Sequence, residues 1–402
     1  MTTSTTLTEW RLSSGLSLSP TAVAVLQQRF KATLTPAVGS SSDELRWDVR
    51  PTNVVGIVHA GDDVIVVQPK MPIANVMFLL AYTADPDHWQ DAADLDDTTS
   101  VPEAVAALFV RLAADATSRG LLRGYRDHSD TLPTVRGRIN LAEMMRRRPG
   151  LGLPLEVTYQ EHDTSVLENQ ILQGATEVLE RFPITRRRTR DGLHRLRATL
   201  AEVTPHPTLQ PDPPEVQWTR LNSHYRAAVE LARLILRGST LDLRAGTHGA
   251  AGITIDMAEV FETFVRVALR RALRLAPEQF PGGDGPPRVH LDEQRRVRLK
   301  PDLRWWDGEA VQFVGDAKYK IDDGGIGRDR DIYQLLAYAT AHGLPDATLV
   351  YADGPEHATL TVVAEGPALH IEHLDLSQGP NGVFEQVDRL ARRINAGART
   401  LA

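Results

Sequence analysis

The sequence has no cysteine in its 402 residues. This absence excludes disulfide bonds, thiol catalysis and cysteine-ligated zinc, and it is typical of a reducing compartment. Long apolar runs are also missing, because the longest, such as Val76–Tyr82, are far too short to span a bilayer. The N-terminal segment MTTSTTLTEW is largely polar and lacks the apolar stretch of a secretory signal peptide. We therefore expect a soluble cytoplasmic protein.

Two sequence signatures of common enzymes are missing as well. There is no G-x-x-x-x-G-K-[ST] phosphate-binding loop, so we expect no nucleotide hydrolysis by this chain. There is no G-x-S-x-G motif, which argues against a serine hydrolase. The 13 histidines are scattered along the chain, and we interpret each as structural or exposed.

The charged residues are unevenly distributed along the chain. Apolar residues make up 42% and charged residues 24%, the balance of a globular protein long enough for two or three domains. The net charge of −7 is unlike that of a typical DNA-binding protein. Residues 85–97 hold six aspartates, whereas residues 181–197 hold seven arginines against one acid, Asp191. We interpret the arginine-rich segment either as a solvated helix face or as a DNA contact. A further basic cluster consists of Arg295, Arg296, Arg298 and Lys300.

Residues 295–338 carry the most informative pattern in the sequence. They predict two short strands, Arg298–Trp306 and about 310–320, joined by Asp307-Gly308, a dipeptide typical of hairpin turns. A helix from about Asp329 is predicted to follow. The basic cluster leads into this hairpin, where it would favour the binding of a phosphate.

Five side chains of this stretch are candidate site residues. Strand side chains repeat every second residue, so Asp316 and Lys318 should project from one face. The hairpin should bring Asp302 onto the neighbouring strand, within reach of both. Gln334 and Tyr338 are four residues apart and share one face of the helix. A surface hairpin with an Asp–Lys ion pair is the simpler interpretation, but the order of the elements favours a catalytic site.

The two carboxylates predict a metal site. Adjacent carboxylates repel each other unless a cation or a shared proton lies between them, and oxygen ligands suit Mg²⁺ or Mn²⁺. Such an ion between Asp302 and Asp316 would polarise a phosphodiester and lower the pKa of a bound water. Lys318 would orient that water or stabilise negative charge that develops on the phosphate. The stretch therefore predicts a nuclease that works by metal-assisted hydrolysis.

Several segments resemble known nucleases. Pro301-Asp302 and Asp316-Ala317-Lys318 resemble the two signature segments of the PD-(D/E)xK superfamily, and Gln334-x-x-x-Tyr338 resembles the QxxxY element of its RecB-like branch. More narrowly, the chain resembles the McrC family, the nuclease subunit of the McrBC modification-dependent restriction system, from about residue 45 to about residue 345. Further matching segments, in the order that the family shows, are Val54–Val58, Gln68-Pro69-Lys70, Val135–Ile139, Asp163-Thr164 with Glu168-Asn169, and Asp256-Met257 with Phe261-Glu262.

The resemblance implies an endonuclease of double-stranded DNA that uses Mg²⁺ (or Mn²⁺). The metal would be held by Asp302, Asp316 and the backbone carbonyl of Ala317, and Lys318 would be the catalytic lysine. It also implies a partner, a hexameric AAA+ GTPase of the McrB type, which would read the modified base. Two other function classes stay open: a scaffold or GTPase-stimulating subunit, and a RecB-like nuclease attached to a helicase.

Further residues are candidates for supporting roles in the site. The superfamily commonly places a glutamate on a helix before the Pro-Asp strand, and Glu262 fits that role as a supporting acid or base. On the predicted helix 256–275, ~100° per residue places Glu262 about 120° and Glu259 about 180° from the centre of the apolar stripe. Glu262 is nearer the boundary, although a solvated surface glutamate fits too, and Glu259 stays an alternative. Gln334 and Tyr338 would position the DNA or the lysine.

Gly137, between Arg136 and Arg138, permits a tight turn with positive φ. The arginines on either side of it would contact a phosphate or the nucleotide site of the partner. The alternative is a strand with a glycine bulge.

We predict an α/β protein of three parts. They are a small α+β partner-binding domain at 1–150, a helical connecting segment at 151–250, and a nuclease domain at 251–402 with a central mixed sheet flanked by helices. Loops are expected at 84–99 and 322–327. The other predicted elements are a hairpin at 53–70, helices at 21–31, 73–82, 102–116, 164–180 with Thr164 as N-cap, 193–203, 221–236 and 381–398, and strands near 347–352, 358–364 and 368–374.

Overall fold

The computed structural model divides the chain into two compact units, Met1–Ala104 with Leu241–Ala402, and Val105–Thr240. The division into two units reflects compactness and not function. The functions assigned to residues 1–150, 151–250 and 251–402 therefore stay a prediction. Most of the expected loop 84–99 and all of the loop 322–327 lie outside the described residues. The residues that the structure describes are 3–38, 45–87, 89, 100–147, 150, 152–206, 213–241, 251–283, 285–286, 288–321, 329–354 and 357–398.

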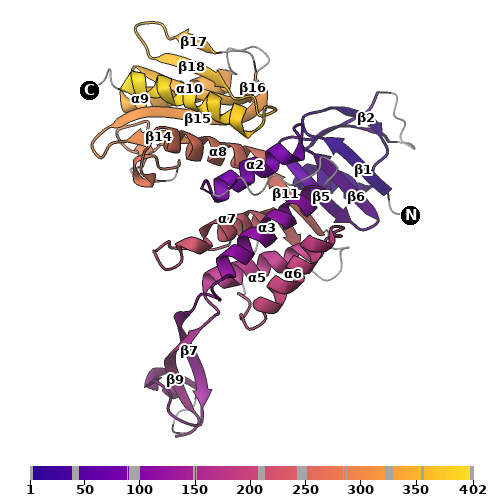
Figure 1. Ribbon diagram of the computed structural model, residues 1–402, viewed down its shortest axis with the longest axis vertical. Coiled ribbons are helices and arrows are strands. Elements are labelled where there is room, and N and C mark those ends of the chain that lie inside the picture. The colour runs from indigo at the N-terminus through magenta and orange to yellow at the C-terminus, as the bar shows by residue number, and fades with distance from the viewer. Residues whose placement is uncertain are drawn as a thin grey trace. The chain divides into compact units, whose positions relative to one another are not determined.

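The N-terminal part of the first unit is built on a sheet with the strand order β1-β6-β5-β11 (Figure 1). The predicted hairpin at 53–70 is confirmed as the antiparallel pair β5 and β6. The strands on either side of this hairpin were not predicted. β1, from the start of the chain, pairs in parallel with β6, and β11, from far along the chain, pairs with β5. The strands span Thr3–Thr8 (β1), Val54–Ala60 (β5), Asp63–Gln68 (β6) and Ala251–Asp256 (β11).

A second small sheet, in the order β2-β4-β3, packs with helix α1 on the same core. The predicted helix at 21–31 is confirmed as α1, and Ser19 caps it by accepting a hydrogen bond from the Ala22 N–H at 3.0 Å. Leu26 and Phe30 are fully buried beside Val58 and Ile65 of the larger sheet. The elements are Ser13–Leu16 (β2), Pro20–Gln28 (α1), Thr33–Pro36 (β3), Trp47–Arg50 (β4) and the following helix Ile73–Ala84 (α2).

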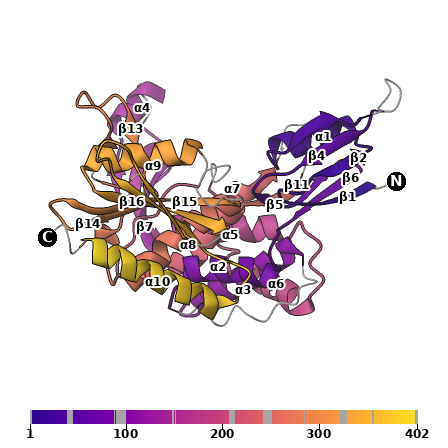
Figure 2. The same ribbon diagram turned by 90° about the horizontal axis from the view of Figure 1, so that it is seen from above.

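The C-terminal part of the first unit is a mixed sheet in the order β14-β15-β16-β18-β17. Helix α9 lies on one side of this sheet and helices α8 and α10 on the other (Figure 2), which confirms the predicted central sheet flanked by helices. Its strands are Leu303–Trp306 (β14), Val311–Ile321 (β15), Asp346–Asp353 (β16), Ala358–Thr361 (β17) and Ala368–His373 (β18). Its helices are Met257–Ala272 (α8), Pro277–Gln279 (η3, a 3₁₀ turn), Asp329–His342 (α9) and Pro380–Ala398 (α10).

Aromatic side chains join the helices on one side of that sheet. The ring of Phe78 on α2 lies 5.5 Å from the ring of Phe264 on α8 and 5.4 Å from the ring of Phe384 on α10, both edge to face. Aromatic pairs at such distances contribute beyond their buried area. Helix α2, which follows the N-terminal sheet in sequence, is therefore part of the core beneath the C-terminal sheet.

The predicted first strand at 298–306 is wrong as a continuous element. It is broken into β13 (Arg298–Leu299), which pairs with β12 (Val289–His290), and β14, which pairs with β15. Pro301 lies in the break, because proline has no N–H to donate to a sheet. The turn that follows β14 is confirmed: Asp307 accepts hydrogen bonds from the N–H groups of Glu309 and Ala310, and Gly308 has a φ of +110°.

The second unit combines helices with a three-stranded sheet in the order β7-β9-β8, which extends below them in Figure 1. The prediction of a helical segment at 151–250 is wrong near its start, because Leu155–Asp163 forms β9. The Thr164 cap is also wrong, since α5 begins at Leu167 after Val166, which makes no side-chain capping bond. The helices are Val101–Thr117 (α3, which begins in the first unit), Leu141–Arg147 (α4), Leu167–Leu179 (α5), Arg187–Thr199 (α6), Ser223–Tyr225 (η2, a 3₁₀ turn) and Arg226–Gly238 (α7). The other strands are Gly124–Leu132 (β7), Arg138–Ile139 (β8) and Ser239–Leu241 (β10).

Candidate active site

The β14–β15 hairpin places the two candidate carboxylates opposite each other. Its antiparallel register pairs Leu303 with Gly315 and Arg304 with Val314. One further step in the same register sets Asp302 across from Asp316. The Ala317 N–H donates a hydrogen bond of 3.2 Å to Asp302 Oδ2, which holds the Asp302 side chain against β15.

Lys318 completes a cluster of three charged groups. Its Nζ contacts Asp316 Oδ2 and lies 3.7 Å from Asp302 Oδ2. The Asp316 side chain is 1% exposed, whereas those of Lys318 and Asp302 are 19% and 21% exposed, so solvent reaches the cluster from their side. No hydrogen-bond donor among the described residues reaches Asp316 Oδ1. A buried carboxylate oxygen without a donor is costly, and it marks a place where a further ligand would fit.

The electrostatics of the cluster follow from burial and from like charge. Burial, and then the neighbouring carboxylate of Asp302, raise the pKa of Asp316 well above its ordinary value, against the opposing effect of Lys318. Burial alone would lower the pKa of Lys318, but the carboxylates of Asp316 and Asp302 outweigh it and raise that pKa above the ordinary value. The amine is therefore charged at neutral pH, and the two carboxylates lack a full complement of positive charge.

Glu262 belongs to the same electrostatic cluster. It lies on α8, and burial together with the charge of Asp302 raises its pKa from 4.5 to about 7, with Lys318 acting in the opposite direction. Glu259 is a minor contributor to that shift. The structure thus brings Glu262 under the influence of both Asp302 and Lys318. A carboxyl group with a pKa near neutrality can accept and donate a proton at physiological pH.

Gln334 and Tyr338 are brought together on α9, but their contacts are with each other and with the backbone. Gln334 Nε2 donates to Tyr338 Oη at 2.6 Å, and Tyr338 Oη donates to the Lys300 carbonyl at 3.0 Å. Burial, and then Asp316, raise the pKa of Tyr338 to about 12, so the hydroxyl keeps its proton. The pair therefore fixes the residue that precedes Pro301-Asp302.

Two polar clusters on β15 were missed by the sequence reasoning. Lys320 continues the alternation of Asp316 and Lys318, and its Nζ lies 2.9 Å from both carboxylate oxygens of the buried Asp331 on α9. The Tyr351 hydroxyl donates to the same carboxylate at 2.9 Å. On the other side of the strand, the Tyr319 hydroxyl donates to Glu9 Oε1 at 2.7 Å. The alternation could have indicated Lys320, but no local signal predicts a partner as distant in sequence as Glu9.

The donor set of the hairpin fits a small divalent cation. In the part of the chain that the structure describes, no three His, Cys, Asp or Glu side chains form a metal site alone. A backbone oxygen is therefore needed beside Asp302 and Asp316. The N–H and C=O of one strand residue point to the same side, and the N–H of Ala317 points at Asp302, so its carbonyl faces that edge too. Two carboxylates and a carbonyl are hard oxygen ligands suited to Mg²⁺ or Mn²⁺.

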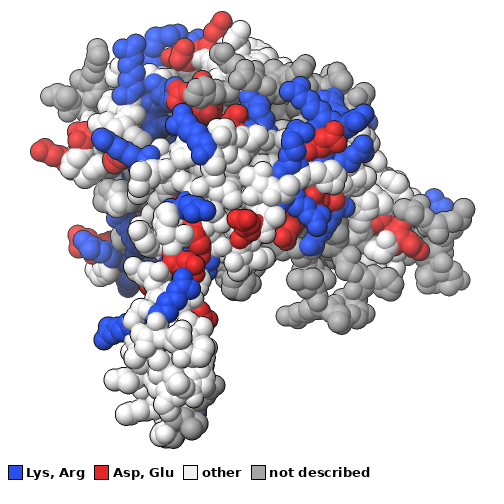
Figure 3. Space-filling view, turned by 60° about the horizontal axis from the view of Figure 1, so that its bottom comes forward, with Lys and Arg blue, Asp and Glu red and all other residues white. Residues whose placement is uncertain are grey.

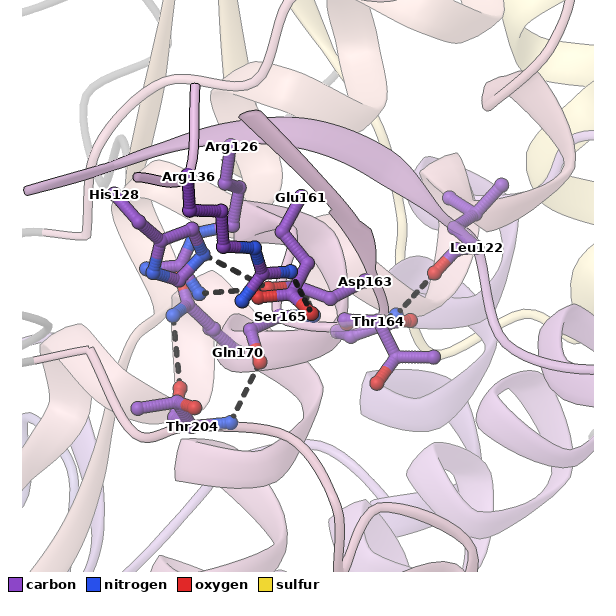
Figure 4. Close-up of polar contacts among 11 residues, drawn as sticks. Leu122, Arg126, His128, Arg136, Glu161, Asp163, Thr164, Ser165, Gln170 and Thr204 are labelled. Carbon is purple, nitrogen blue, oxygen red and sulfur yellow. Dashed lines mark hydrogen bonds and ion pairs between the residues drawn. The ribbon is translucent and has the colours of Figure 1, made fainter. Parts of the chain in front are cut away.

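The Gly137 segment and the Asp163 segment meet in the second unit, at the base of the β7–β9 sheet (Figure 4). Arg136 pairs with Glu161 at 3.2 Å and lies over the Tyr159 ring at 4.0 Å. Asp163 lies 3.4 Å from His128 Nε2 and accepts a hydrogen bond from the Ser165 N–H. These side chains are engaged within the sheet and at its junction with α5.

Gly137 itself forms the positive-φ turn that the sequence allowed. Its φ is +71°, and an added Cβ would lie 2.5 Å from the Thr158 carbonyl oxygen. The glycine therefore serves the close packing of β8 on β9. No phosphate contact is needed to explain it.

Asn169 ties the start of α5 to the preceding chain. Its Nδ2 donates to the carbonyls of Leu122 at 2.9 Å and Thr164 at 2.7 Å. The segments Asp163-Thr164 and Glu168-Asn169 thus hold together the place where the β7–β9 sheet joins the helices (Figure 4).

The comparisons with known proteins identify the family of the chain. The family model described as "McrBC 5-methylcytosine restriction system component" matches residues 49–352. The chain belongs to this McrBC family. That match spans the hairpin, Glu262 and the Gly137 segment, and it confirms the resemblance predicted from the sequence. None of the curated proteins compared with the McrBC-family chain matches it.

One solved structure shows the same fold. The McrBC-family chain is similar to a chain of the Thermococcus gammatolerans assembly described as McrB AAA+ hexamers with bound McrC. The TM-score is 0.53 and the identity 18%, covering 98% of this chain and 100% of the other. A Thermococcus gammatolerans McrBC complex matches with a TM-score of 0.42 and 20% identity, over 67% of this chain and 88% of the other. The first likeness confirms the mixed α/β fold. None of the helices in the described residues is long and apolar enough to cross a membrane.

Proposed function

We propose that this chain is the DNA endonuclease subunit of a GTP-dependent restriction system directed at modified DNA in the cytoplasm. The observation that carries the proposal is the convergence of Asp302, Asp316 and Lys318 at the end of the β14–β15 hairpin, with Asp316 Oδ1 lacking a donor. The chain's membership of the McrBC family supports it.

The metal ligands are proposed to be Asp302, Asp316 and the carbonyl of Ala317. A bound Mg²⁺ or Mn²⁺ ion supplies a Lewis acid that polarises the phosphodiester and acidifies a water. Asp302 is kept in place by the Ala317 N–H and Asp316 by its burial, so both carboxylates are positioned before the DNA arrives.

The other site residues act on protons and on position. Lys318 stays protonated at neutral pH, so it stabilises negative charge on the phosphate rather than acting as a base. Glu262, with a pKa near 7, takes or returns a proton in hydrolysis. Gln334 and Tyr338 are positioning residues, because Tyr338 holds the Lys300 carbonyl and with it the Pro301-Asp302 segment.

The proposed partner is an AAA+ GTPase of the McrB type. The solved Thermococcus gammatolerans assembly contains McrB AAA+ hexamers with bound McrC. The sequence itself has no G-x-x-x-x-G-K-[ST] loop, so GTP hydrolysis must come from another chain. Exposed apolar side chains of the β7–β9 sheet, its loops and helix α4 support a protein contact in this region. On the face shown in Figure 3, this part of the molecule carries mainly uncharged residues. The exposed apolar residues are Tyr125, Val135, Leu141, Met145 and Leu153.

The test is cleavage of methylated and unmethylated plasmid by this chain mixed with its GTPase, with Mg²⁺ and GTP. Wild type is compared with Asp316→Asn and with a matched control, Asp329→Asn, an exposed acid at the start of α9. We expect cleavage to require GTP, methylation and Asp316, and to survive the control substitution. Loss of metal-bound water activation should lower the rate at least about 100-fold.

Other outcomes would favour the alternative functions. Cleavage that needs Asp316 but ignores GTP and methylation would leave a nuclease of the RecB-like kind. If Asp316→Asn stimulates GTP hydrolysis as well as wild type and neither protein cuts DNA, the scaffold function replaces the nuclease.

A further inference from the structure

Helix α6 and the residues just before it concentrate positive charge on a chain that is acidic as a whole. Residues 181–197 hold seven arginines and one aspartate, a net charge of +6, whereas the whole chain carries −7 and the remainder therefore −13. All seven cations are arginine, whose planar guanidinium binds phosphate oxygens in pairs. Such segregation on an acidic chain points to a specific anionic ligand.

Four of the five arginines of α6 lie on two sides of the helix. The buried residues Thr189, Gly192, Leu193 and Leu196 define the face turned to the core. With ~100° per residue, Arg188 and Arg195 lie about 20° apart on one side of the exposed surface, and Arg190 and Arg197 lie together on the opposite side. Arg188 and Arg195 are about 10.5 Å apart along the axis, at ~1.5 Å per residue.

The two sides differ in their ion pairs. Arg197 pairs with Glu180 at 3.2 Å, and Arg187 in the middle of the exposed surface pairs with Asp191 at 3.5 Å. Arg188 and Arg195 are exposed, and among the described residues neither has a carboxylate partner. Their charges are thus not neutralised within the part of the second unit that the structure describes.

These two arginines stand on a rigid support. Gly192 lets α6 approach α3 closely, because an added Cβ would lie 2.3 Å from Val110 Cγ1. Leu193 and Leu196 are buried. Side chains on a packed helix lose less freedom on binding than side chains on a loop.

The chemistry of the surface favours a double-stranded nucleic acid. Proteins that bind single strands stack bases on aromatic side chains, and α6 has no Phe, Tyr or Trp. The cations alone suit the regularly spaced phosphates of a duplex.

We propose that Arg188 and Arg195 form a phosphate-binding surface for double-stranded DNA, distinct in its residues from the hairpin that carries Asp302 and Asp316. This inference rests on the proposed function in one respect, that DNA is the substrate. It assigns to the second unit a sequence-independent binding of the DNA backbone.

The experiment measures binding of a 30-base-pair duplex to the full chain, alone and with its GTPase, in EDTA so that nothing is cut. The affinity is followed as a function of KCl concentration. Each lost phosphate contact lowers the slope of log K against log salt by about 0.9, so Arg188→Gln with Arg195→Gln should lower it by about 1.8. The matched control, Arg187→Gln with Arg197→Gln, removes the same charge from ion-paired positions and should leave the slope unchanged. Circular dichroism melting confirms that both variants fold.

Three outcomes would overturn the proposal. Equal slope changes for the two pairs would mean a general charge effect. An unchanged slope for Arg188→Gln with Arg195→Gln would mean that these residues touch no phosphate. Weaker assembly with the GTPase at an unchanged DNA slope would make the surface a protein contact. Binding is measured without cleavage, so the two proposals can fail separately. The salt slope can support the arginine surface even if the Asp316 cleavage test contradicts the nuclease, and cleavage can support the nuclease even if the slope does not change.

Discussion

Tyr319 donates a hydrogen bond to Glu9, a residue 310 positions earlier in the chain. Tyr319 stands between Lys318 and Lys320 on β15, and Glu9 follows β1. The same Glu9 oxygen accepts the Lys70 N–H at 2.7 Å, and the Lys70 ammonium lies 5.2 Å from the centre of the Tyr319 ring. The strand with the candidate catalytic residues is therefore anchored to the N-terminal sheet.

Tyr319→Phe should destabilise the protein by about 1–2 kcal/mol, because Glu9 stays buried and loses a donor. Urea unfolding of the full chain measures this. Tyr333→Phe, at a residue that is 68% exposed, is the control and should change the unfolding free energy by less than about 0.5 kcal/mol. An equal effect of the two changes would mean that the Glu9 contact contributes nothing.

Asp316→Asn should abolish stabilisation by metal without destabilising the metal-free protein. Burial and Asp302 disfavour the Asp316 carboxylate, so a neutral amide relieves repulsion at pH 7. Wild type should gain about 2.7 kcal/mol when Mg²⁺ or Mn²⁺ is present at a hundred times its dissociation constant, and the variant should gain none. Thermal unfolding with and without metal measures both effects. The control variant Asp329→Asn should keep the stabilisation by metal. If Asp316→Asn keeps it too, Asp316 is not a metal ligand.

The stability of the metal-free protein should fall between about pH 4.5 and about pH 7 because of Glu262. Its pKa is raised from 4.5 to about 7, so the folded state holds a proton that the unfolded state has already lost. The unfolded state binds fewer protons in this window, so the unfolding free energy decreases as the pH rises. Glu262→Gln removes this contribution, and its unfolding free energy relative to wild type should increase from pH 5 to pH 8. Denaturation in EDTA at several pH values tests it, and a constant difference would contradict the raised pKa.

Gly137→Ala should loosen the β7–β9 sheet more than a comparable glycine change elsewhere in the second unit. Gly137 and Gly120 both have positive φ, so alanine is strained at each by about 1–2 kcal/mol. Only at Gly137 does the new Cβ collide with backbone, at 2.5 Å from the Thr158 oxygen, whereas nothing lies within 4 Å at Gly120. Hydrogen exchange of the β9 amides should therefore accelerate strongly in Gly137→Ala and little in Gly120→Ala. Similar exchange rates of the β9 amides in the two variants would mean that β8 can move to accommodate the new Cβ without loosening the sheet.

The site could be predicted from the sequence where its geometry is local. The alternation of a strand sets Asp316 beside Lys318, and a short hairpin sets Asp302 opposite, whatever the rest of the fold does. Pro301 also carried a local signal, since proline interrupts a ladder, and the break between β13 and β14 follows from it. The roles assigned to these residues stay a prediction until cleavage is measured.

The rest of the fold depends on pairings between distant segments, which composition and periodicity do not encode. β1 joins β6 across more than fifty residues, and β11 joins β5 across nearly two hundred. The start of the helix after β9 was predicted wrongly although its signals are local. Thr164 is a good capping residue, yet Asp163 already accepts the Ser165 N–H in a turn. The helix therefore begins two residues after Ser165, at Leu167. Local hydrogen bonding by Asp competes with capping by its neighbour.

The pairing of β5 with β11 has a consequence during synthesis. At ~5–20 residues per second, a ribosome that has completed β5 at Ala60 needs roughly 10–40 s to reach β11 at Ala251. Until then one edge of the nascent N-terminal sheet has open hydrogen-bonding groups and can pair with another chain. A chaperone that covers this edge, or slow translation between residues 60 and 251, would therefore matter more for this protein than for one whose sheets close in order of synthesis.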